Sequence, residues 1–427
     1  MSARSALKTS PLPLFADLAQ VFKRPSGVVA GGDLITSIRS FDLFGAPTVA
    51  FEREGIPYLV NEFWTAGQRQ AHSLHEVSYR GCFKAQLPEF FIERTTREGE
   101  AVHDPFMGRG TTLVQAALMG RAPMGNDINP LSTLLVRPRL APPPLAAVER
   151  RLRDVPWDSV NVDHGDDLLA FYHPRTLAHL NALRFWLERE APLDRPDPDP
   201  VVDWIRMVSL NRLTGHSPGF FSGRTMPPNQ AISVEAQRRI NERLGAMPPE
   251  RDLVKVILKK SRTLLKDGLP PAHPQATLLT GDAAGSGTIA AGSVALVVTS
   301  PPFLDVVQYA DDNWLRCWFA GIDVAAVPIS MHKTEAAWER MVRGVLSEQA
   351  RILRPGGHVA FEVGEVRGGR VLLERLVWSA VEGLPFDRLA VTVNQQEFTK
   401  TAACWGVSNN AKGTNTNRVV LLRRRSP

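Results

Sequence analysis

The sequence has few cysteines and no long apolar run, and each absence excludes a class of protein. Its three cysteines, Cys82, Cys317 and Cys404, stand singly in a chain of 427 residues. Without a CxxC pair or metal-site spacing, neither a disulfide-stapled domain nor a structural metal is expected. No run of about 18 apolar residues is present, so the sequence predicts no membrane span. The N-terminal residues lack the apolar stretch of a secretory signal, which predicts a cytoplasmic protein.

The bulk composition is that of a globular protein with a moderate excess of positive charge. Hydrophobic residues make up 44% and charged residues 22% of the chain, values that are ordinary for soluble domains. A chain of 427 residues is long enough for two or three lobes. The net charge of +6 and the isoelectric point near 9.4 are compatible with an anionic partner.

Strand-like and helix-like segments alternate in the order of a doubly wound α/β fold. The residues that predict strands are 101–103, 123–127, 276–280, 294–298, 358–363, 388–393 and 417–422. Helical apolar spacing follows the first of them over 111–120, and an amphipathic helix is predicted over 338–352. We therefore expect a mixed seven-stranded, Rossmann-like sheet, closed by an antiparallel pair formed by the last two strands.

The middle of the chain differs in composition from its flanks. Prolines at 142–144 and in the acidic segment 194–200 mark boundaries or exposed loops. Between them and beyond, helical spacing recurs, and residues 201–271 carry 12 Lys/Arg against 6 Asp/Glu. The expected organisation is an N-terminal arm over 1–55, a first part of the main domain over 56–140, an inserted, largely helical region over 141–272, and a second part over 273–427.

Asp104-Pro-Phe-Met-Gly-Arg-Gly-Thr-Thr112 has the composition of a turn that holds a nucleoside-type cofactor. Gly108 and Gly110 allow close backbone approach, and Thr111 can cap the helix that follows. No Gly-Lys-Ser/Thr follows and the third glycine of a dinucleotide fingerprint is missing, which disfavours phosphate ligands. S-adenosylmethionine has no phosphate, and Asp104 is placed to meet its ammonium group. The alternative for such a glycine pair alone is a tight structural turn.

Two further acids follow predicted strands. Asp127 stands where doubly wound folds place an acid on ribose hydroxyls. Asp282, after a later strand, is placed to accept a hydrogen bond from an adenine amino group. The alternative for each is a solvated loop carboxylate.

Thr299-Ser-Pro-Pro-Phe303 comes directly after a fully apolar strand. Together with the upstream turn, it resembles the (Ser/Asp/Asn)-Pro-Pro-(Tyr/Phe) tetrad of the amino-methyltransferases that modify DNA bases. The resemblance implies that Ser300 and a neighbouring main-chain carbonyl accept the two hydrogens of the target amine. Phe303 would stack on the extruded base, while Pro301 and Pro302 fix the shape of the turn.

The resemblance extends to segments on both sides of these motifs. Phe83 and Lys84 look like the core of another cofactor-binding segment, and Phe106 belongs to the glycine turn. Asn129 follows Asp127 as in the second motif of the family. Residues 398–407 and 412–418 look like a C-terminal signature of bacterial DNA methyltransferases, in which Lys400 could contact phosphates. Loop capping is the alternative for that segment.

In this family, a long insertion between the cofactor motifs and the tetrad commonly holds the target-recognition region. The basic residues 201–271 lie in that position, with a loop that contains Phe220, Phe221 and Arg224. The paired aromatic rings could enter a base stack, or they could anchor the loop to its own core.

The sequence thus predicts an S-adenosylmethionine-dependent methyltransferase of double-stranded DNA, without a metal, associated with the nucleoid and compatible with a homodimer. A Ser in the first tetrad position is similar to the cytosine-N4 enzymes, whereas Asp or Asn there is usual for adenine-N6 enzymes. Cytosine-C5 methylation is excluded, because none of the three cysteines has the Pro-Cys context of its nucleophile. The alternatives are adenine-N6 methylation, methylation of an RNA amino group, and a DNA-binding module without activity.

Overall fold

The protein is described from a computed structural model. The described residues are 33–64, 71–161, 163, 166–195, 197–225, 231–304, 309–328, 332–367, 370–395 and 416–426. Among the helices in these ranges, none combines the length and the apolar character needed to cross a membrane.

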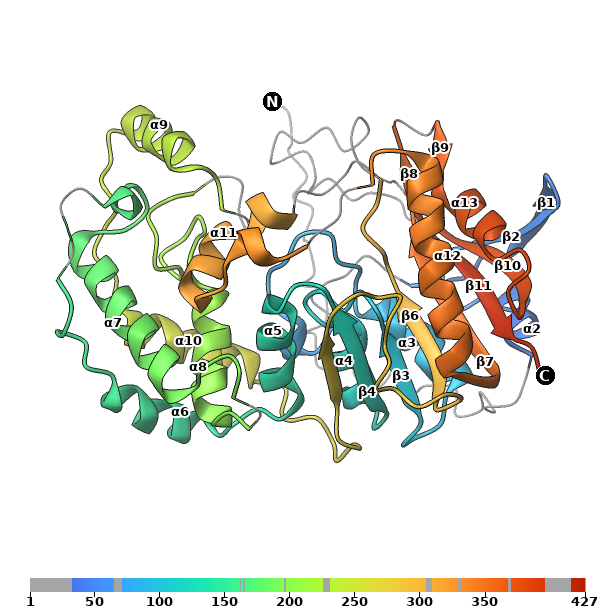
Figure 1. The fold of residues 1–427 in the computed structure, drawn as a ribbon, viewed down its shortest axis with the longest axis horizontal. Helices are drawn as coiled ribbons and strands as arrows, with labels where there is room; N and C mark the ends of the chain where they lie inside the picture. Colours follow the sequence, from blue (N-terminus) through green and yellow to red (C-terminus); the bar gives the residue numbers. More distant parts are fainter. Residues whose placement is uncertain are drawn as a thin grey trace, which may run out of the picture.

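A nine-stranded mixed sheet forms the centre of the larger lobe (Figure 1). Its strands are β1 (Val49–Arg53), β2 (Ile56–Asn61), β3 (Ala101–Asp104), β4 (Ala122–Asp127), β5 (Thr277–Thr280), β6 (Val294–Thr299), β7 (Leu353–Val363), β10 (Phe386–Gln395) and β11 (Thr416–Arg424). Their order across the sheet is β1-β2-β10-β11-β7-β6-β3-β4-β5. Only β1 and β11 run against their neighbours; all other pairs are parallel. The predicted mixed α/β class is confirmed, and so is the antiparallel closing pair.

The prediction of seven strands is wrong by two, because β1 and β2 join the sheet beside β10. Glu54 and Gly55 connect them, both with positive φ values of 54° and 72°, which is the geometry of a two-residue hairpin turn. In β2, the alternation of apolar residues is limited to Ile56, Tyr58 and Val60. Since β1 is exposed along its whole length, it has no buried apolar side chains that would indicate a strand. A two-residue turn of this kind usually contains Asn or Asp before Gly, so Glu54 gave little signal for it.

Helices cover both faces of the sheet. They are α2 (Leu34–Arg39), α3 (Gln86–Thr95), α4 (Thr111–Leu118), α5 (Leu131–Leu140), α12 (Glu335–Ile352) and α13 (Leu373–Ala380). The helices α12 and α13 pack on one face around Trp338 and Phe361. On the other face, α2 and α3 pack around Phe90 and Phe91. The alternating side chains of each strand therefore supply two separate apolar cores.

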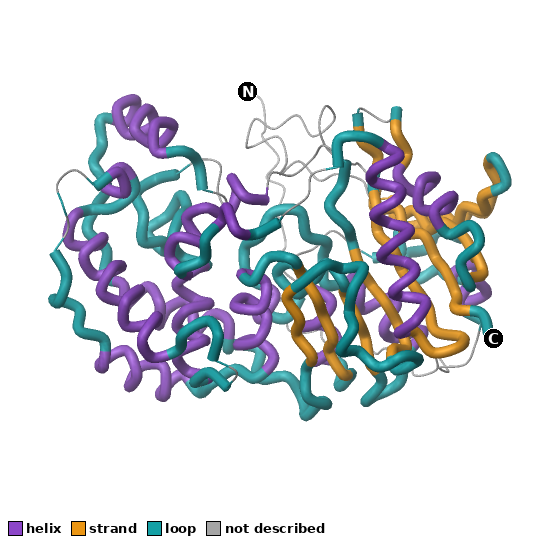
Figure 2. Tube along the Cα trace, viewed as in Figure 1, coloured by secondary structure: helices purple, strands orange, loops and turns teal. Residues whose placement is uncertain are grey.

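The second lobe is helical and lies beyond the β5 edge of the sheet (Figures 1 and 2). Its helices are α6 (Leu145–Arg151), α7 (Pro174–Glu190), α8 (Pro200–Leu210), α9 (Val234–Leu244), α10 (Leu253–Leu264) and α11 (Tyr309–Ala320). One apolar cluster runs from α4 and α5 into α7, α8 and α10, with Trp186 and Trp204 fully buried. This continuous core fixes the helical lobe to the sheet next to the strand ends that carry the predicted motifs.

Candidate active site

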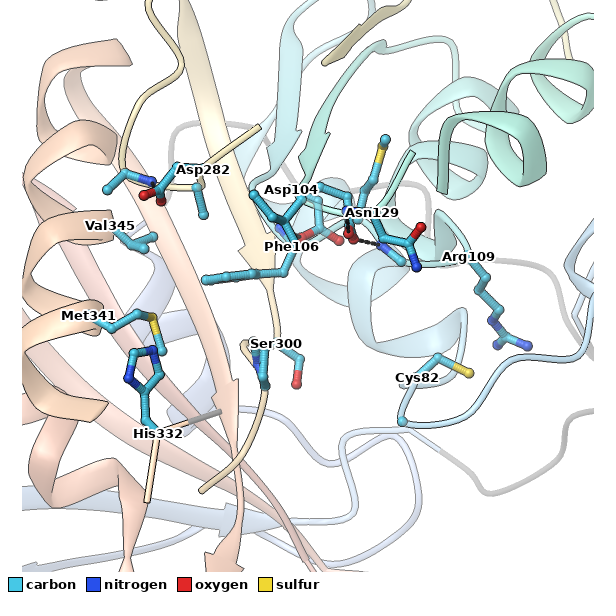
Figure 3. A pocket seen from close by; sticks show the side chains of 18 of the residues that line it. Cys82, Asp104, Phe106, Arg109, Asn129, Asp282, Ser300, His332, Met341 and Val345 are labelled. Atoms are coloured by element: carbon cyan, nitrogen blue, oxygen red, sulfur yellow. Dashed lines mark hydrogen bonds between the residues drawn. The ribbon is translucent and has the colours of Figure 1, made fainter. Parts of the chain in front are cut away.

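A cavity of ≈ 380 Å³ opens at the carboxyl ends of β3, β4 and β6, where open α/β sheets bind ligands. Predicted site residues that line it are Phe83, Asp104, Phe106, Gly108, Thr111, Asp127, Asn129, Asp282, Ser300 and Pro302. Figure 3 shows Ser300 and Phe106 on one side, opposite Met341 and His332. The parallel strands thus bring the two separate sequence motifs to one cavity.

The glycine turn takes its shape from left-handed backbone and from close packing beneath it. Gly110 has a φ of 76°, and a Cβ atom there would lie 2.4 Å from a methyl carbon of Val136 on α5. The turn is closed by the amide of Gly110, which donates to the carbonyl of Met107, and by the amide of Met107, which donates to the carbonyl of Asn126. Gly110 is therefore required for the turn, although it does not itself line the cavity.

Asp127 bridges the turn and the loop after β4. One carboxylate oxygen accepts from the amide of Gly108 at 2.8 Å, and the other accepts from the amide of Asn129 at 2.9 Å. Burial raises the pKa of Asp127. The side chain of Asn129 in turn accepts from the amide of Leu131, the first residue of α5. These contacts fix the carboxylate at the cavity wall, where each oxygen retains a lone pair for a ligand hydroxyl.

Asp104 connects the glycine turn to the strand that precedes the tetrad. Its carboxylate accepts from the hydroxyl of Thr299 at 2.6 Å and from the amide of Phe106 at 3.1 Å. Both donors are neutral, and burial raises the pKa of Asp104 to about 7. An ammonium group in the cavity would stabilise the charged form of this carboxylate.

Two arginines that sequence reasoning missed connect the segment 74–83 to the turn. Arg109 donates to the carbonyl oxygens of Val77 and Phe83 at 2.9 and 3.3 Å. Arg139 is fully buried and donates to the carbonyl oxygens of Leu74, Leu135 and Arg109. Burial lowers the pKa of Arg139 to about 9. Apart from Leu135, their partners are main-chain carbonyls distant in sequence, so no local residue pattern indicates the interaction.

The tetrad places its four side chains differently. Ser300 and Pro302 line the cavity, whereas Pro301 is buried and Phe303 packs half-buried against the core under α12. The carbonyl of Pro302 accepts a hydrogen bond of 2.8 Å from the indole nitrogen of Trp338. That oxygen is therefore engaged within the protein, which disfavours it as the main-chain acceptor of a target amine.

The wall beside Asp282 comes from α12, which the sequence did not connect with a cofactor. Asp282 is exposed and accepts from the amide of Ala284 at 2.9 Å. Lining residues that were not predicted include Tyr79, Arg109, His332, Arg340, Met341, Gly344 and Val345. The predicted Lys84 is half-buried beside the cavity without lining it, and burial lowers its pKa. The apolar periodicity of the sequence predicted α12 as a helix, but it could not show that part of this helix lines the cavity.

The aromatic pair of the predicted recognition loop faces the protein interior. Phe221 is fully buried and Phe220 is 7% exposed, with the guanidinium of Arg212 over the Phe220 ring at 4.1 Å. This arrangement favours the alternative in which the two rings anchor their loop. Arg224 is exposed at the end of the same loop. Lys400 and most of the C-terminal signature lie outside the described residues.

The residues of the cavity fit S-adenosylmethionine better than a phosphate-bearing nucleotide. Asp104, Asp127 and Asp282 give the wall acceptors for an ammonium group, hydroxyls and an amino group. The three carboxylates would repel a phosphate. The guanidinium group of Arg109, which also lines the cavity, already donates to main-chain carbonyls. Phe106 and Met341 offer apolar surface between these polar points.

Comparisons with known proteins agree with these features over part of the chain. Residues 52–132 match the family model N6_N4_Mtase, described as DNA methylase. Type II methyltransferase M.MjaII of Methanocaldococcus jannaschii is 31% identical over 133 residues, which are 31% of this chain and 25% of that protein. Type II methyltransferase M.MvaI of Kocuria varians is 30% identical over 120 residues, covering 26% of this chain and 25% of that protein. The chain thus spans about a quarter of the length of these curated relatives.

Two solved structures from Thermus thermophilus are similar to parts of this chain. TrmN is 13% identical, with a TM-score of 0.32 and coverage of 82% of this chain and 51% of that one. A putative DNA modification methylase is 22% identical, with a TM-score of 0.22 and coverage of 34% of this chain and 52% of that one.

Proposed function

Because the chain belongs to the N6/N4 family of DNA amino-methyltransferases, we propose that it methylates the exocyclic N4 of a flipped-out cytosine in double-stranded DNA. The observation that carries the proposal is the shared cavity: Ser300 lies on the same wall as Asp104 and Phe106 of the glycine turn. A target amine held at Ser300 would thus be next to a ligand held by the turn.

The residues of the site divide the work between holding a cofactor and orienting an amine. The cofactor, S-adenosylmethionine, supplies a methyl group on a positively charged sulfur. Asp104 would hold its ammonium group, Asp127 its hydroxyls and Asp282 its adenine amino group. Ser300 and a neighbouring main-chain carbonyl would accept the two amine hydrogens, which directs the nitrogen lone pair toward the methyl carbon. Positioning of this kind needs no covalent nucleophile on the protein.

Nucleoside mass spectrometry of DNA from a host that expresses the chain tests this proposal. We expect N4-methylcytosine with the parent chain and its loss, by at least about 100-fold, with Ser300→Ala, because a hydrogen-bond acceptor of the amine is removed. Ser293→Ala is the matched control, since that exposed hydroxyl donates to Ala290 away from the cavity. N6-methyladenine instead would assign adenine as the target. DNA with neither modified base would refute methylation at every sequence that the host genome contains.

The affinity for S-adenosylmethionine is expected to increase as the pH rises from about 6 to about 7.5, by up to about tenfold per pH unit. Asp104 has a pKa of about 7 in the free protein, so binding of an ammonium group at lower pH must release its proton. Calorimetry in buffers of different ionisation enthalpy measures that proton directly. Asp104→Asn should bind more weakly and without proton release; equal proton release in both proteins would contradict the assignment.

The same raised pKa has a consequence for stability. The usual pKa of an aspartate is 3.8 and that of Asp104 in the fold is about 7, so the folded protein binds more protons between these values. The ionisation of Asp104 therefore makes the cofactor-free protein less stable as the pH rises through that window. Cofactor binding should offset this loss.

A further inference from the structure

One wall of the cavity is built by a segment that has no regular secondary structure. Residues 76–84 belong to neither a helix nor a strand, yet Tyr79, Gly81, Cys82 and Phe83 line the cavity. An irregular segment lacks the repeated backbone hydrogen bonds of a helix or a strand. Contacts with other elements therefore have to hold this wall in place.

The two ends of the segment and its middle are held by different elements. Arg109 of the glycine turn donates to the carbonyl oxygens of Val77 and Phe83 and so attaches both ends. In the middle, the side chain of Arg80 does not line the cavity, although both of its chain neighbours do. Its Nη1 instead donates to both carboxylate oxygens of Asp312 on α11, at 2.8 and 2.9 Å.

A second arginine, Arg316 on α11, contacts the same segment. Its guanidinium group donates to the carbonyl of Ser78 at 3.1 Å and lies 5.8 Å from the centre of the Tyr79 ring. A further hydrogen bond of 2.7 Å to the side chain of Asn313 fixes the orientation of the guanidinium group. On the other side of the ring, a Cβ atom on Gly108 would lie 3.6 Å from Tyr79. The Tyr79 ring is thus placed between α11 and the glycine turn.

The helix that makes these contacts is itself fixed in the core of the helical lobe. It packs on α5, α7 and α8 and lies on the side of that lobe that faces the sheet (Figure 1). Its buried apolar side chains, each at most 2% exposed and part of the core shared with α7 and α8, are Leu315, Cys317 and Phe319. The segment 78–83 is therefore attached to a rigid element.

The ion pair between Arg80 and Asp312 is partly buried. The two side chains are 46% and 7% exposed. Water and salt screen a pair of this kind less than a pair on the surface, and a buried carboxylate that loses its cationic partner is costly. The pair therefore restrains Arg80 more strongly than contacts between two mobile surface side chains would.

We propose that Arg80, Asp312 and Arg316 are positioning residues that hold the segment 78–83 in the conformation that binds S-adenosylmethionine. The inference rests on the proposed function, which assigns the cavity to that cofactor. None of the three side chains lines the cavity, so they act through Tyr79 and its neighbours in the segment. A wall that is already ordered in the free protein does not have to be ordered at the expense of binding free energy.

Calorimetric titration of the full chain with S-adenosylmethionine tests the role of the ion pair. We expect Arg80→Met to raise the Kd roughly tenfold, the scale of one lost hydrogen bond between charged groups. The variant should fold, because the side chain of Arg80 is half-exposed. The Kd of Arg80→Lys should lie between those of the parent and Arg80→Met, since lysine keeps the charge without the guanidinium geometry.

Arg423→Met is the matched control for this loss of an arginine. The side chain of Arg423 is 45% exposed and donates to Asp387 at 2.9 Å. Asp387 lies at the amino end of β10, whereas the cavity lies at the carboxyl ends of the parallel strands. The control variant should bind S-adenosylmethionine with the Kd of the parent.

A double-mutant cycle shows whether Arg80 and Asp312 act as a pair. Asp312→Ala should raise the Kd about as much as Arg80→Met, and the double variant should bind no more weakly than either single one. Arg316→Met removes a separate contact, the one with Ser78, so combining it with Arg80→Met should raise the Kd further. Independent effects of Arg80→Met and Asp312→Ala, multiplied in the double variant, would overturn the assignment of the pair.

Kinetics separate positioning of the cofactor from the chemical step. In single-turnover methylation, Arg80→Met should reach the parent rate at saturating S-adenosylmethionine, while the half-saturating concentration rises roughly tenfold. A lower saturated rate at an unchanged Kd would contradict the inference. If the parent binds the cofactor but methylates no DNA, the proposed function fails, and calorimetry still tests this inference. Equal Kd values in the parent, Arg80→Met and Asp312→Ala would refute it, whatever the activity.

Discussion

Replacing Gly110 by alanine is expected to lower the free energy of unfolding by about 3 kcal/mol and to abolish most binding of S-adenosylmethionine. Two effects add. An alanine at a φ of 76° is strained, and its Cβ atom would lie 2.4 Å from a methyl carbon of Val136. Val136 is fully buried on α5 and cannot move away without disturbing the core. Chemical denaturation and calorimetric titration with S-adenosylmethionine measure the two losses.

Gly108→Ala is the matched control for this experiment. Gly108 also has a positive φ, of 48°, but the nearest atom to an added Cβ would be a ring carbon of Tyr79 at 3.6 Å. We therefore expect only the backbone strain there, about 1 kcal/mol. Adding Val136→Ala to Gly110→Ala should recover part of the stability by making room for the methyl group. Equal destabilisation by the two glycine variants would show that the contact with Val136 is unimportant.

Replacing Arg139 by leucine is expected to destabilise the protein by roughly 3 kcal/mol or more, since each buried carbonyl left without a donor costs about 1–3 kcal/mol. Arg139 donates to the carbonyl oxygens of Leu74 and Arg109, which lie on two loops that build the cavity. The variant should therefore lose cofactor affinity as well as thermal stability. Thermal unfolding with and without S-adenosylmethionine gives both quantities.

Arg153→Leu serves as the control for loss of a guanidinium group. Its side chain is 74% exposed and only approaches Glu149 at 3.8 Å, so we expect a change within about 0.5 kcal/mol. The loss of stability in Arg139→Lys should lie between those of Arg139→Leu and Arg153→Leu, because an ammonium group cannot donate to all the carbonyls that the guanidinium group contacts. A stable Arg139→Leu protein with full affinity would mean that the carbonyl contacts are dispensable.

The local patterns of the sequence were sufficient for most elements near the site. The apolar run Val294–Thr299 forms the buried β6, and the residues from Ala101 to Asp127 form β3, α4 and β4 in the predicted order. These predictions succeeded because each depends on a periodicity or a turn within a few residues. The hairpin of β1 and β2 was not predicted, because its turn carries Glu54 at the position where Asn or Asp usually indicates such a turn.

The sequence by itself determined the fold class, the family resemblance and the two motifs that meet at the cavity, because those features are written in neighbouring residues. Only the tertiary structure decided which partners complete the site. Arg139 reaches the main-chain carbonyls of Leu74 and Arg109, and α12 forms the far wall, although these residues are distant from one another in the chain. The tertiary structure also places the side chains of Phe220 and Phe221 in the core. Such contacts arise from how strands align and helices pack, and burial then raises the pKa of Asp104, so no local pattern of residues contains them.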